Sequence, residues 1–334
     1  MRFFYLFIFI FQFPLLSSAI SAEKPTLIVY TYDSFTSDWG PGPKIKTAFE
    51  EICDCELKYV ALEDGVSLLS RLKLEGKHTK ADIVLGLDTN LMANAEKTGY
   101  FSPHEMTLDN LTLPQKWTNS HFIPYDFGYF AFVYDKDKLK NPPTSLKALI
   151  ENPDSPKILI QDPRTSTPGL GLLLWVKKIY GDKAAEAWEK LAPRIVTVSK
   201  GWSEAYGLFL KGEAPMVLSY TTSPAYHMIA EEKNNFASAK FSEGHYQQIE
   251  VAGMIAASKN KELAKKFLSF IQGETFQKII PTTNWMYPAA LAKSELPEAF
   301  NALIDPEPAL IFSSDEVYKN RKAWVSEWLN ALAK

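Results

Sequence analysis

Six aromatic side chains lie in or beside predicted turns, where no strand or helix propensity accounts for a large ring. They are Tyr32, Trp39, Trp202, Tyr220, Tyr226 and Trp285. The face of such a ring attracts a cation or stacks on a flat heteroaromatic group, and each well-placed contact contributes about 0.5 to 2 kcal/mol. Any single ring is also explained as cover for the edge of a lobe. Six rings at equivalent turns together favour an aromatic cage for a small ligand.

Two aspartates near these turns can add negative charge to such a cage. Asp64 and Asp88 each precede a predicted helix, so both also suit the capping of a helix N-terminus. For Asp88, capping explains the residue as well as a contact with a ligand does. Asp64, which is followed by Gly65, is expected to pair with the positive or amino edge of a ligand.

Two hydroxyl-rich segments open predicted helices and suit an anion. They consist of Ser166, Thr167 and Pro168, and of Thr221, Thr222, Ser223 and Pro224. A helix that begins in this way offers free backbone N–H groups and the positive end of its dipole. Two such helix starts facing one crevice would suit a phosphate, although plain helix capping is an equally good explanation.

The sequence lacks the usual motifs of enzymes and metal sites. It contains no H-E-x-x-H, no G-x-S-x-G, no P-loop and no G-x-G-x-x-G. The five histidines are scattered without ligand spacing at positions 78, 104, 121, 227 and 245. The two cysteines, Cys53 and Cys55, precede a predicted strand and so belong at the end of the sheet opposite the expected crevice. We therefore expect no catalytic residue, no metal and no cofactor.

The first 22 residues have the pattern of a cleaved secretory signal peptide. Arg2 precedes an apolar run from Phe3 to Leu16, which is too short to span a bilayer, and small residues follow it. Cleavage after Ala19 and cleavage after Ala22 both fit. An oxidising compartment favours a disulfide between Cys53 and Cys55, but with one intervening residue two buried thiols remain an alternative.

Charge and length limit the class of protein further. The chain has 36 Lys and Arg against 39 Asp and Glu, a formal net charge of -3, so we expect no nucleic-acid partner. At roughly 150 residues per domain, its 334 residues predict two lobes.

Predicted strands and helices alternate almost throughout the chain. Strands are predicted at 26–32, 56–61, 81–87, 127–134, 157–161, 195–198, 215–219 and 249–256. Helices are predicted at 44–52, 66–74, 90–97, 145–150, 168–180, 183–191, 203–210, 224–232, 262–271 and 315–333. This alternation is typical of doubly wound α/β lobes. Such lobes bind ligands outside the carboxyl ends of their strands, where the rings, hydroxyls and acids described above would meet.

Several long motifs resemble those of the thiamine-binding proteins of bacterial ABC importers, members of the type II periplasmic solute-binding protein family. They include Y-T-Y-D-S-F-x-x-D-W-G-P-G-P at 30–43, Q-D-P-R-T-S-T-P-G-L-G-L-L-L-W at 161–175, L-S-Y-T-T-S-P-A-Y-H at 218–227 and I-P-T-x-N-W-M-Y-P at 280–288. The resemblance covers essentially the whole mature chain and weakens over 292–314. It implies an α/β fold with two lobes, each a mixed sheet flanked by helices, and a ligand cleft between them.

The resemblance also implies where the lobes and the contacts lie. The N-lobe would comprise 23–125 and 252–287, and the C-lobe 126–251 and 288–334, with the chain crossing near 124–127, 250–252 and 287–289. The family's ligand contacts would fall on Asp64, Gly65, Ser166, Thr167, Trp202, Tyr220, Thr221, Thr222 and Ser223. Tyr32, Trp39, Tyr226 and Trp285 would line the same cleft.

By this resemblance the chain is a periplasmic monomer without enzymatic activity. It would bind thiamine, thiamine monophosphate or thiamine diphosphate and deliver the ligand to an inner-membrane permease with its ATPase subunit. A ferric-ion or oxyanion carrier shares the fold, but the iron carriers use adjacent tyrosines as ligands, whereas Tyr220 is followed by Thr221. A thiaminase-like enzyme of the same fold is the other alternative, and it needs a cysteine in the cleft.

Overall fold

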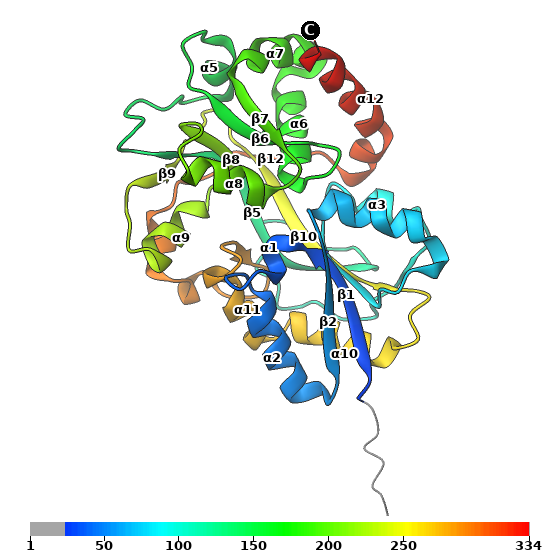
Figure 1. Ribbon diagram of the computed structural model, residues 1–334. Helices are drawn as coiled ribbons and strands as arrows, with labels where there is room; N and C mark the ends of the chain where they lie inside the picture. Colours follow the sequence, from blue (N-terminus) through cyan, green and yellow to red (C-terminus); the bar gives the residue numbers. More distant parts are fainter. Residues whose placement is uncertain (1–23, 334) are drawn as a thin grey trace, which may run out of the picture.

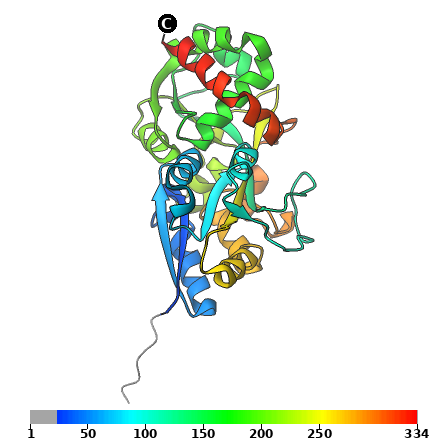
Figure 2. The same ribbon diagram turned by 90° about the vertical axis from the view of Figure 1, so that its right-hand side faces the viewer.

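A computed structural model describes residues 24–333 and shows two lobes joined by long strands (Figures 1 and 2). The predicted signal peptide lies outside the described residues. One lobe contains β1 (Thr26–Tyr32), β2 (Glu56–Leu62) and β3 (Ile83–Asp88), which run parallel to one another. The other contains β6 (Ile158–Gln161), β7 (Ile195–Ser199) and β8 (Met216–Tyr220), which are also parallel. The predicted α/β fold class is confirmed.

Two antiparallel strands connect these parallel sets into the order β2-β1-β3-β10-β5-β8-β6-β7. They are β5 (Phe122–Asp135) and β10 (His245–Ile255), which pair with each other from Gln247 and Tyr129 to Gly253 and Phe122. β3 pairs with one part of β10, and β8 pairs with the far part of β5. Both strands therefore belong to both lobes, as Figure 1 shows for β10 between the two halves.

The pairing of β5 and β10 is irregular at the junction between the lobes. The register shifts between Glu250 and Val251, whose partners are Asp126 and Pro124. A short strand, β11 (Tyr287–Pro288), pairs with β5 at Phe127 and Asp126. A shift of this kind bends a strand locally, so the sheet changes direction between the two lobes. The residue bounds of the lobes given above remain a prediction.

Helices flank both parallel sets, and every predicted helix is present with small differences at its ends. The helices are α1 (Asp33–Thr36), α2 (Gly42–Cys53), α3 (Gly65–Glu75), α4 (Met92–Glu96), α5 (Leu146–Glu151), α6 (Thr167–Tyr180), α7 (Ala184–Leu191), α8 (Trp202–Leu210), α9 (Ser223–Ala230), α10 (Lys261–Ile271), α11 (Glu274–Ile279) and α12 (Ser314–Leu332). Among residues 24–333, no helix is long and apolar enough to cross a membrane.

The sequence-based prediction of elements was wrong or incomplete at a few places. Both crossing strands begin earlier than predicted, β5 at Phe122 instead of 127 and β10 at His245 instead of 249. The helices α1 and α11 and the short strands β4 (Phe101–Ser102), β9 (Phe236–Ser238), β11 and β12 (Ala309–Leu310) were missed. These elements are short and their edges are set by contacts with distant segments, which a local pattern does not contain.

The two cysteines form a disulfide at the turn between α2 and β2. Cys53 ends α2, Cys55 directly precedes β2, and Asp54 between them has a positive φ of 50°. Of the two alternatives left open by the sequence, the structure has the disulfide. The pair closes a tight turn at the end of β2 remote from the strand ends that carry the predicted site.

Gly171 of α6 allows this helix to pack closely on β5, because it has no side chain. This contact provides a test of the packing. An added Cβ on Gly171 would overlap the ring of Phe130, which is fully buried. Overpacking a filled core costs about 1 to 3 kcal/mol. We expect Gly171→Ala to lower the free energy of unfolding by that amount, measured by urea denaturation followed by circular dichroism.

Gly207→Ala is the matched control, because Gly207 also lies inside a helix but has open space around its Cβ position. Alanine is the better helix former by about 1 kcal/mol, so this variant should be as stable as the parent or more so. Equal stability of the two variants would contradict the packing described for α6.

Candidate functional site

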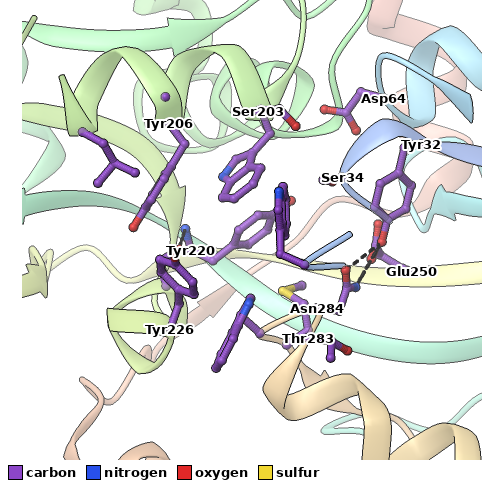
Figure 3. A pocket seen from close by; sticks show the side chains of 17 residues that line it. Tyr32, Ser34, Asp64, Ser203, Tyr206, Tyr220, Tyr226, Glu250, Thr283 and Asn284 are labelled. Carbon is purple, nitrogen blue, oxygen red and sulfur yellow. Dashed lines mark hydrogen bonds between the residues drawn. The ribbon is translucent and has the colours of Figure 1, made fainter. Parts of the chain in front are cut away.

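A cavity of about 280 Å³ lies between the lobes, at the strand ends predicted to carry the site (Figure 3). Its walls come from the β1–α1 turn, the start of α3, α8, the β8–α9 turn, β10 and the segment before β11. The lining residues are Tyr32, Ser34, Trp39, Asp64, Trp202, Ser203, Tyr206, Gly207, Leu210, Tyr220, Ser223, Tyr226, Glu250, Thr283, Asn284, Trp285 and Met286. Figure 3 shows Tyr206, Tyr220 and Tyr226 across the cavity from Asp64, Tyr32 and Glu250.

All six aromatic residues singled out in the sequence line this one cavity. The Trp39 and Trp202 rings come from opposite lobes, with centroids 6.1 Å apart, and Tyr226 meets Trp285 edge to face at 5.3 Å. Tyr206 stacks on Trp202 at 4.9 Å. These rings are therefore assembled from both lobes into a common wall, although their contact with a ligand remains a prediction.

Hydrogen bonds and backbone geometry fix two of these rings. Trp202 Nε1 donates to Ser219 Oγ at 2.7 Å, so the plane of the indole is held against β8. Trp285 has a positive φ of 57°, which is unusual for a bulky residue, and its N–H donates to the Ile280 carbonyl at 3.1 Å. The preceding N–H, of Asn284, donates to the same carbonyl at 2.9 Å. The chain thus sets the direction of the Trp285 ring through a tight local turn.

Asp64 uses both of its carboxylate oxygens for hydrogen bonds within the protein. Oδ1 accepts from the N–H of Gly65 at 2.8 Å and caps α3. Oδ2 accepts from Ser166 Oγ of the other lobe at 2.7 Å. Burial raises the pKa of Asp64 to about 6, while these hydrogen bonds favour the charged form. Asp64 thus lines the cavity and also connects the start of α3 with the start of α6.

Asp88 does not line the cavity, and its hydrogen bonds lie within the turn that precedes α4. Its Oδ2 accepts from Asn90 Nδ2 at 2.6 Å, and its Oδ1 accepts from the N–H of Leu91 at 3.2 Å. Burial raises its pKa to about 7. The predicted capping of the following helix is not found, because α4 begins after Leu91 without a side-chain cap, and Asp88 instead stabilises the turn before it.

Of the hydroxyl-bearing residues at the two helix starts, one lines the cavity and four do not. Ser223 lines the cavity, but Ser166, Thr167, Thr221 and Thr222 are buried behind its wall. Gly65 also lies behind the wall, and an added Cβ there would overlap Thr167 Oγ1 and the Gly86 carbonyl oxygen. The lobes therefore meet at Gly65, Ser166 and Thr167. Their predicted role as ligand contacts is not visible in this closed arrangement and remains a prediction.

Direct contacts between the lobes close one side of the cavity. Besides the contact of Ser166 with Asp64, Ser203 Oγ donates to Asp33 Oδ1 at 2.9 Å. The N–H of Ser67 donates to the Thr165 carbonyl at 3.1 Å. A ligand in the cavity would thus be enclosed by side chains of both lobes.

The sequence analysis missed a buried group of polar residues at the junction of the lobes. Tyr32 OH donates to Glu250 Oε2 at 2.9 Å, and Asn284 Nδ2 donates to Asp126 Oδ2 at 2.6 Å and to Tyr32 OH at 3.0 Å. Burial raises the pKa of Asp126 to about 7, and burial together with the neighbouring Asp126 raises that of Glu250 well above its ordinary value. A carboxyl group inside an otherwise apolar strand was the available signal, because an acid is seldom buried without a specific role.

Tyr206 and Leu210 were also missed, and their spacing could have revealed them. They follow Trp202 by four and eight residues on α8, so all three side chains lie on one face of the helix. Residues on the same face as a predicted ring are candidates for the same wall.

The cavity carries negative charge and no positive charge. Its lining includes the carboxyl groups of Asp64 and Glu250 but no Lys, Arg or His. In the part of the chain that the structure describes, no group of three or more His, Cys, Asp or Glu side chains could hold a metal ion. The arrangement suits an organic cation with flat rings, because carboxylates and ring faces both attract positive charge.

The buried carboxyl groups predict that the ligand-free protein is more stable in mild acid. Asp64, Asp88, Asp126 and Glu250 bind a proton more readily in the folded chain than in the unfolded chain, where carboxyl groups titrate near pH 4. Their stabilising contribution is fully present below about pH 4 and is lost as the pH rises through about 6 to 7. We expect the melting temperature, measured by circular dichroism, to fall between about pH 5 and pH 8.

Glu250→Gln should reduce this dependence, since the amide does not titrate. Glu105→Gln is the matched control, because Glu105 is exposed and pairs with Lys265 on the surface. A melting temperature that is constant or rises from pH 5 to pH 8 would show that these carboxyl groups are ionised in the folded chain.

Comparisons with known proteins agree with this geometry. Residues 78–320 match the model of the family described as bacterial extracellular solute-binding protein. The chain is 60% identical over 320 residues to the thiamine-binding periplasmic protein of Escherichia coli K12, covering 96% of this chain and 97% of the relative. It is 58% identical over 320 residues to the protein of the same name from Salmonella typhimurium LT2, with the same coverage.

A solved structure titled periplasmic thiamin binding protein superposes with a TM-score of 0.91 at 60% identity. The match covers 93% of this chain and 97% of that chain. The resemblance inferred from the sequence motifs is thereby confirmed. The chain belongs to the bacterial extracellular solute-binding protein family.

Proposed function

We propose that this chain captures thiamine in the bacterial periplasm by closing its two lobes around the ligand, and then delivers it to the permease of an ABC importer. The observation that carries the proposal is the cavity lined by aromatic rings and carboxyl groups without any basic side chain. The relatives named thiamine-binding periplasmic protein, at up to 60% identity, support the same ligand. Thiamine combines a cationic thiazolium ring, a flat aminopyrimidine and a hydroxyethyl arm.

Each part of thiamine has a matching part of the cavity. The rings of Trp202, Tyr220 and Trp285 would enclose the flat groups, and the carboxyl groups would lie near the positive charge. The hydroxyl of Ser223, at the start of α9, would receive the arm. The same position would take the phosphate of thiamine monophosphate or diphosphate, which we include in the proposal.

Lobe closure follows from how the cavity is built. Trp39 and Asp64 come from one lobe, and Trp202 and Tyr220 come from the other, so a ligand contacts all four only when the lobes are together. A ligand that contacts both lobes shifts the population towards the closed state. We propose that the permease, with its ATPase subunit, recognises this state in a monomeric binding protein that uses no cofactor and catalyses no reaction.

The positions of the cysteines and carboxyl groups support a carrier over the two alternatives. A thiaminase-like enzyme needs a cysteine in the cleft, but Cys53 and Cys55 are bonded to each other and neither lines the cavity. A ferric-ion carrier of this fold uses adjacent tyrosines as ligands, whereas Tyr220 is followed by Thr221, and the described residues contain no metal-binding group of His, Cys, Asp and Glu side chains. Incubation with thiamine and a base acceptor should therefore release no free thiazole, and its release would identify an enzyme.

The aromatic wall can be tested through Trp202. We expect Trp202→Ala to weaken thiamine affinity more than tenfold, because the indole face and the stacked pair with Tyr206 are both lost. Titration by intrinsic fluorescence or calorimetry measures the affinity, and circular dichroism verifies the fold. Unchanged affinity in the folded variant would reject the role of this ring.

Trp117→Phe is the matched control for that experiment. Trp117 is half-buried outside the cavity lining and donates to the Phe122 carbonyl at 3.0 Å. Its replacement also changes the fluorescence, but it should leave thiamine affinity as in the parent protein. Calorimetric titration with thiamine and its two phosphates then ranks the three ligands.

A further inference from the structure

One carboxylate oxygen of Glu250, Oε1, receives no hydrogen bond from a donor among the described residues. Its Oε2 accepts from Tyr32 OH at 2.9 Å and from Asn284 Nδ2 at 3.4 Å. Oε1 is not completely buried, although Glu250 as a whole is. Because Glu250 lines the cavity, this oxygen is available to a ligand.

Asp64 differs from Glu250 in this respect. Both oxygens of Asp64 already accept hydrogen bonds, one from the backbone of α3 and one from Ser166 of the other lobe. Contact with a ligand would compete with these bonds. Of the two carboxyl groups in the wall, Glu250 is therefore the better counter-charge for a cation.

Asp126 lies beside Glu250, and the two residues form a buried pair of carboxyl groups. The two residues are paired across β5 and β10, where both strands pass between the lobes. Asp126 Oδ2 accepts from Asn284 Nδ2, whereas Asp126 Oδ1 is buried without a hydrogen-bond donor. A proton on Glu250 would supply that missing donor.

No Lys, Arg or His side chain lines the cavity beside the pair, so no positive charge of the protein balances the two carboxyl groups there. The groups that face it are Tyr32 of β1, Tyr125 of β5, Tyr220 of β8, Asn284 before β11 and the carboxyl group of Asp64 at the start of α3. Two carboxylates side by side away from solvent repel each other, so one of them keeps a proton at neutral pH. The raised pKa values of Asp126 and Glu250 given above agree with this arrangement.

We propose that Glu250, supported by Asp126, recognises the positive charge of the ligand, and that the pair holds one proton before binding and releases it when the cation enters. The carboxyl group of Glu250 becomes a carboxylate, and its proton passes to the solvent. A cation within about 4 to 6 Å lowers the pKa of a carboxyl group by about 1 to 3 units, which favours release of the shared proton. The inference rests on the proposed function only in taking the ligand to be a cation.

The pair also contacts a segment that forms part of the cavity wall. Asn284 donates to Asp126 and lies next to Trp285, whose ring forms part of the wall. A change of protonation therefore acts on the hydrogen bonds that hold this segment, at the point where the register of β10 shifts. Binding of a cation and closure of the lobes would both depend on the same pair.

Calorimetric titration with thiamine, in buffers of different ionisation enthalpy at about pH 7.5, counts the protons released on binding. We expect about one proton per thiamine for the parent protein and an affinity that rises with pH up to tenfold per unit. Glu250→Gln should bind at least tenfold more weakly and release no proton. Its amide can accept from Tyr32 and donate to Asp126, so the fold should be kept, which thermal unfolding verifies.

Two controls separate the pair from other sources of protons. Asp88→Asn should still release about one proton, because Asp88 is a buried carboxyl group outside the cavity lining and the pair is intact. Thiochrome, a flat and uncharged derivative of thiamine, should bind without proton release. Binding of thiamine by the parent without proton release, or release by Glu250→Gln as large as in the parent, would overturn this inference and leave the proposed function standing. Failure of the folded parent to bind thiamine would overturn the proposed function itself.

Discussion

The antiparallel pairing of β5 with β10 is the constraint on which the rest of the structure depends. These strands join two parallel sets into one sheet path, so the carboxyl ends of strands from both lobes face a shared space. Because each lobe is built around its own parallel strands, neither could form the cavity alone. The rings in its wall are contributed by segments as distant in sequence as Tyr32 and Trp285.

The fold could be predicted from the sequence to a large extent because its parallel strands and helices have local signals. The apolar run of β3 and the capping serine of α5 are examples of such signals. The length of β5 and β10 could not be predicted in this way. The pairing of β5 continues through Pro124, a residue type that weakens a strand prediction, because a distant partner strand supplies the hydrogen bonds.

The candidate site was predicted in part for the same physical reason. Rings at turns are conspicuous, and the six that were noted line one cavity. The buried pair of Asp126 and Glu250 was missed, because the two acids lie on strands far apart in the sequence. Only the pairing of the strands places the two carboxyl groups side by side. The helix starts near Ser166 and Thr221 were recognised, but local sequence does not indicate whether a helix start is open or covered by the opposite lobe.

The left-handed backbone of Trp285 has a consequence for selectivity. Holding a bulky residue at this φ costs about 1 to 3 kcal/mol, which surrounding contacts must offset. A rotation of the Trp285 backbone would break the turn that begins at Ile280. We therefore expect the wall to keep its position here when a ligand enters, which favours a flat ring over a thicker molecule.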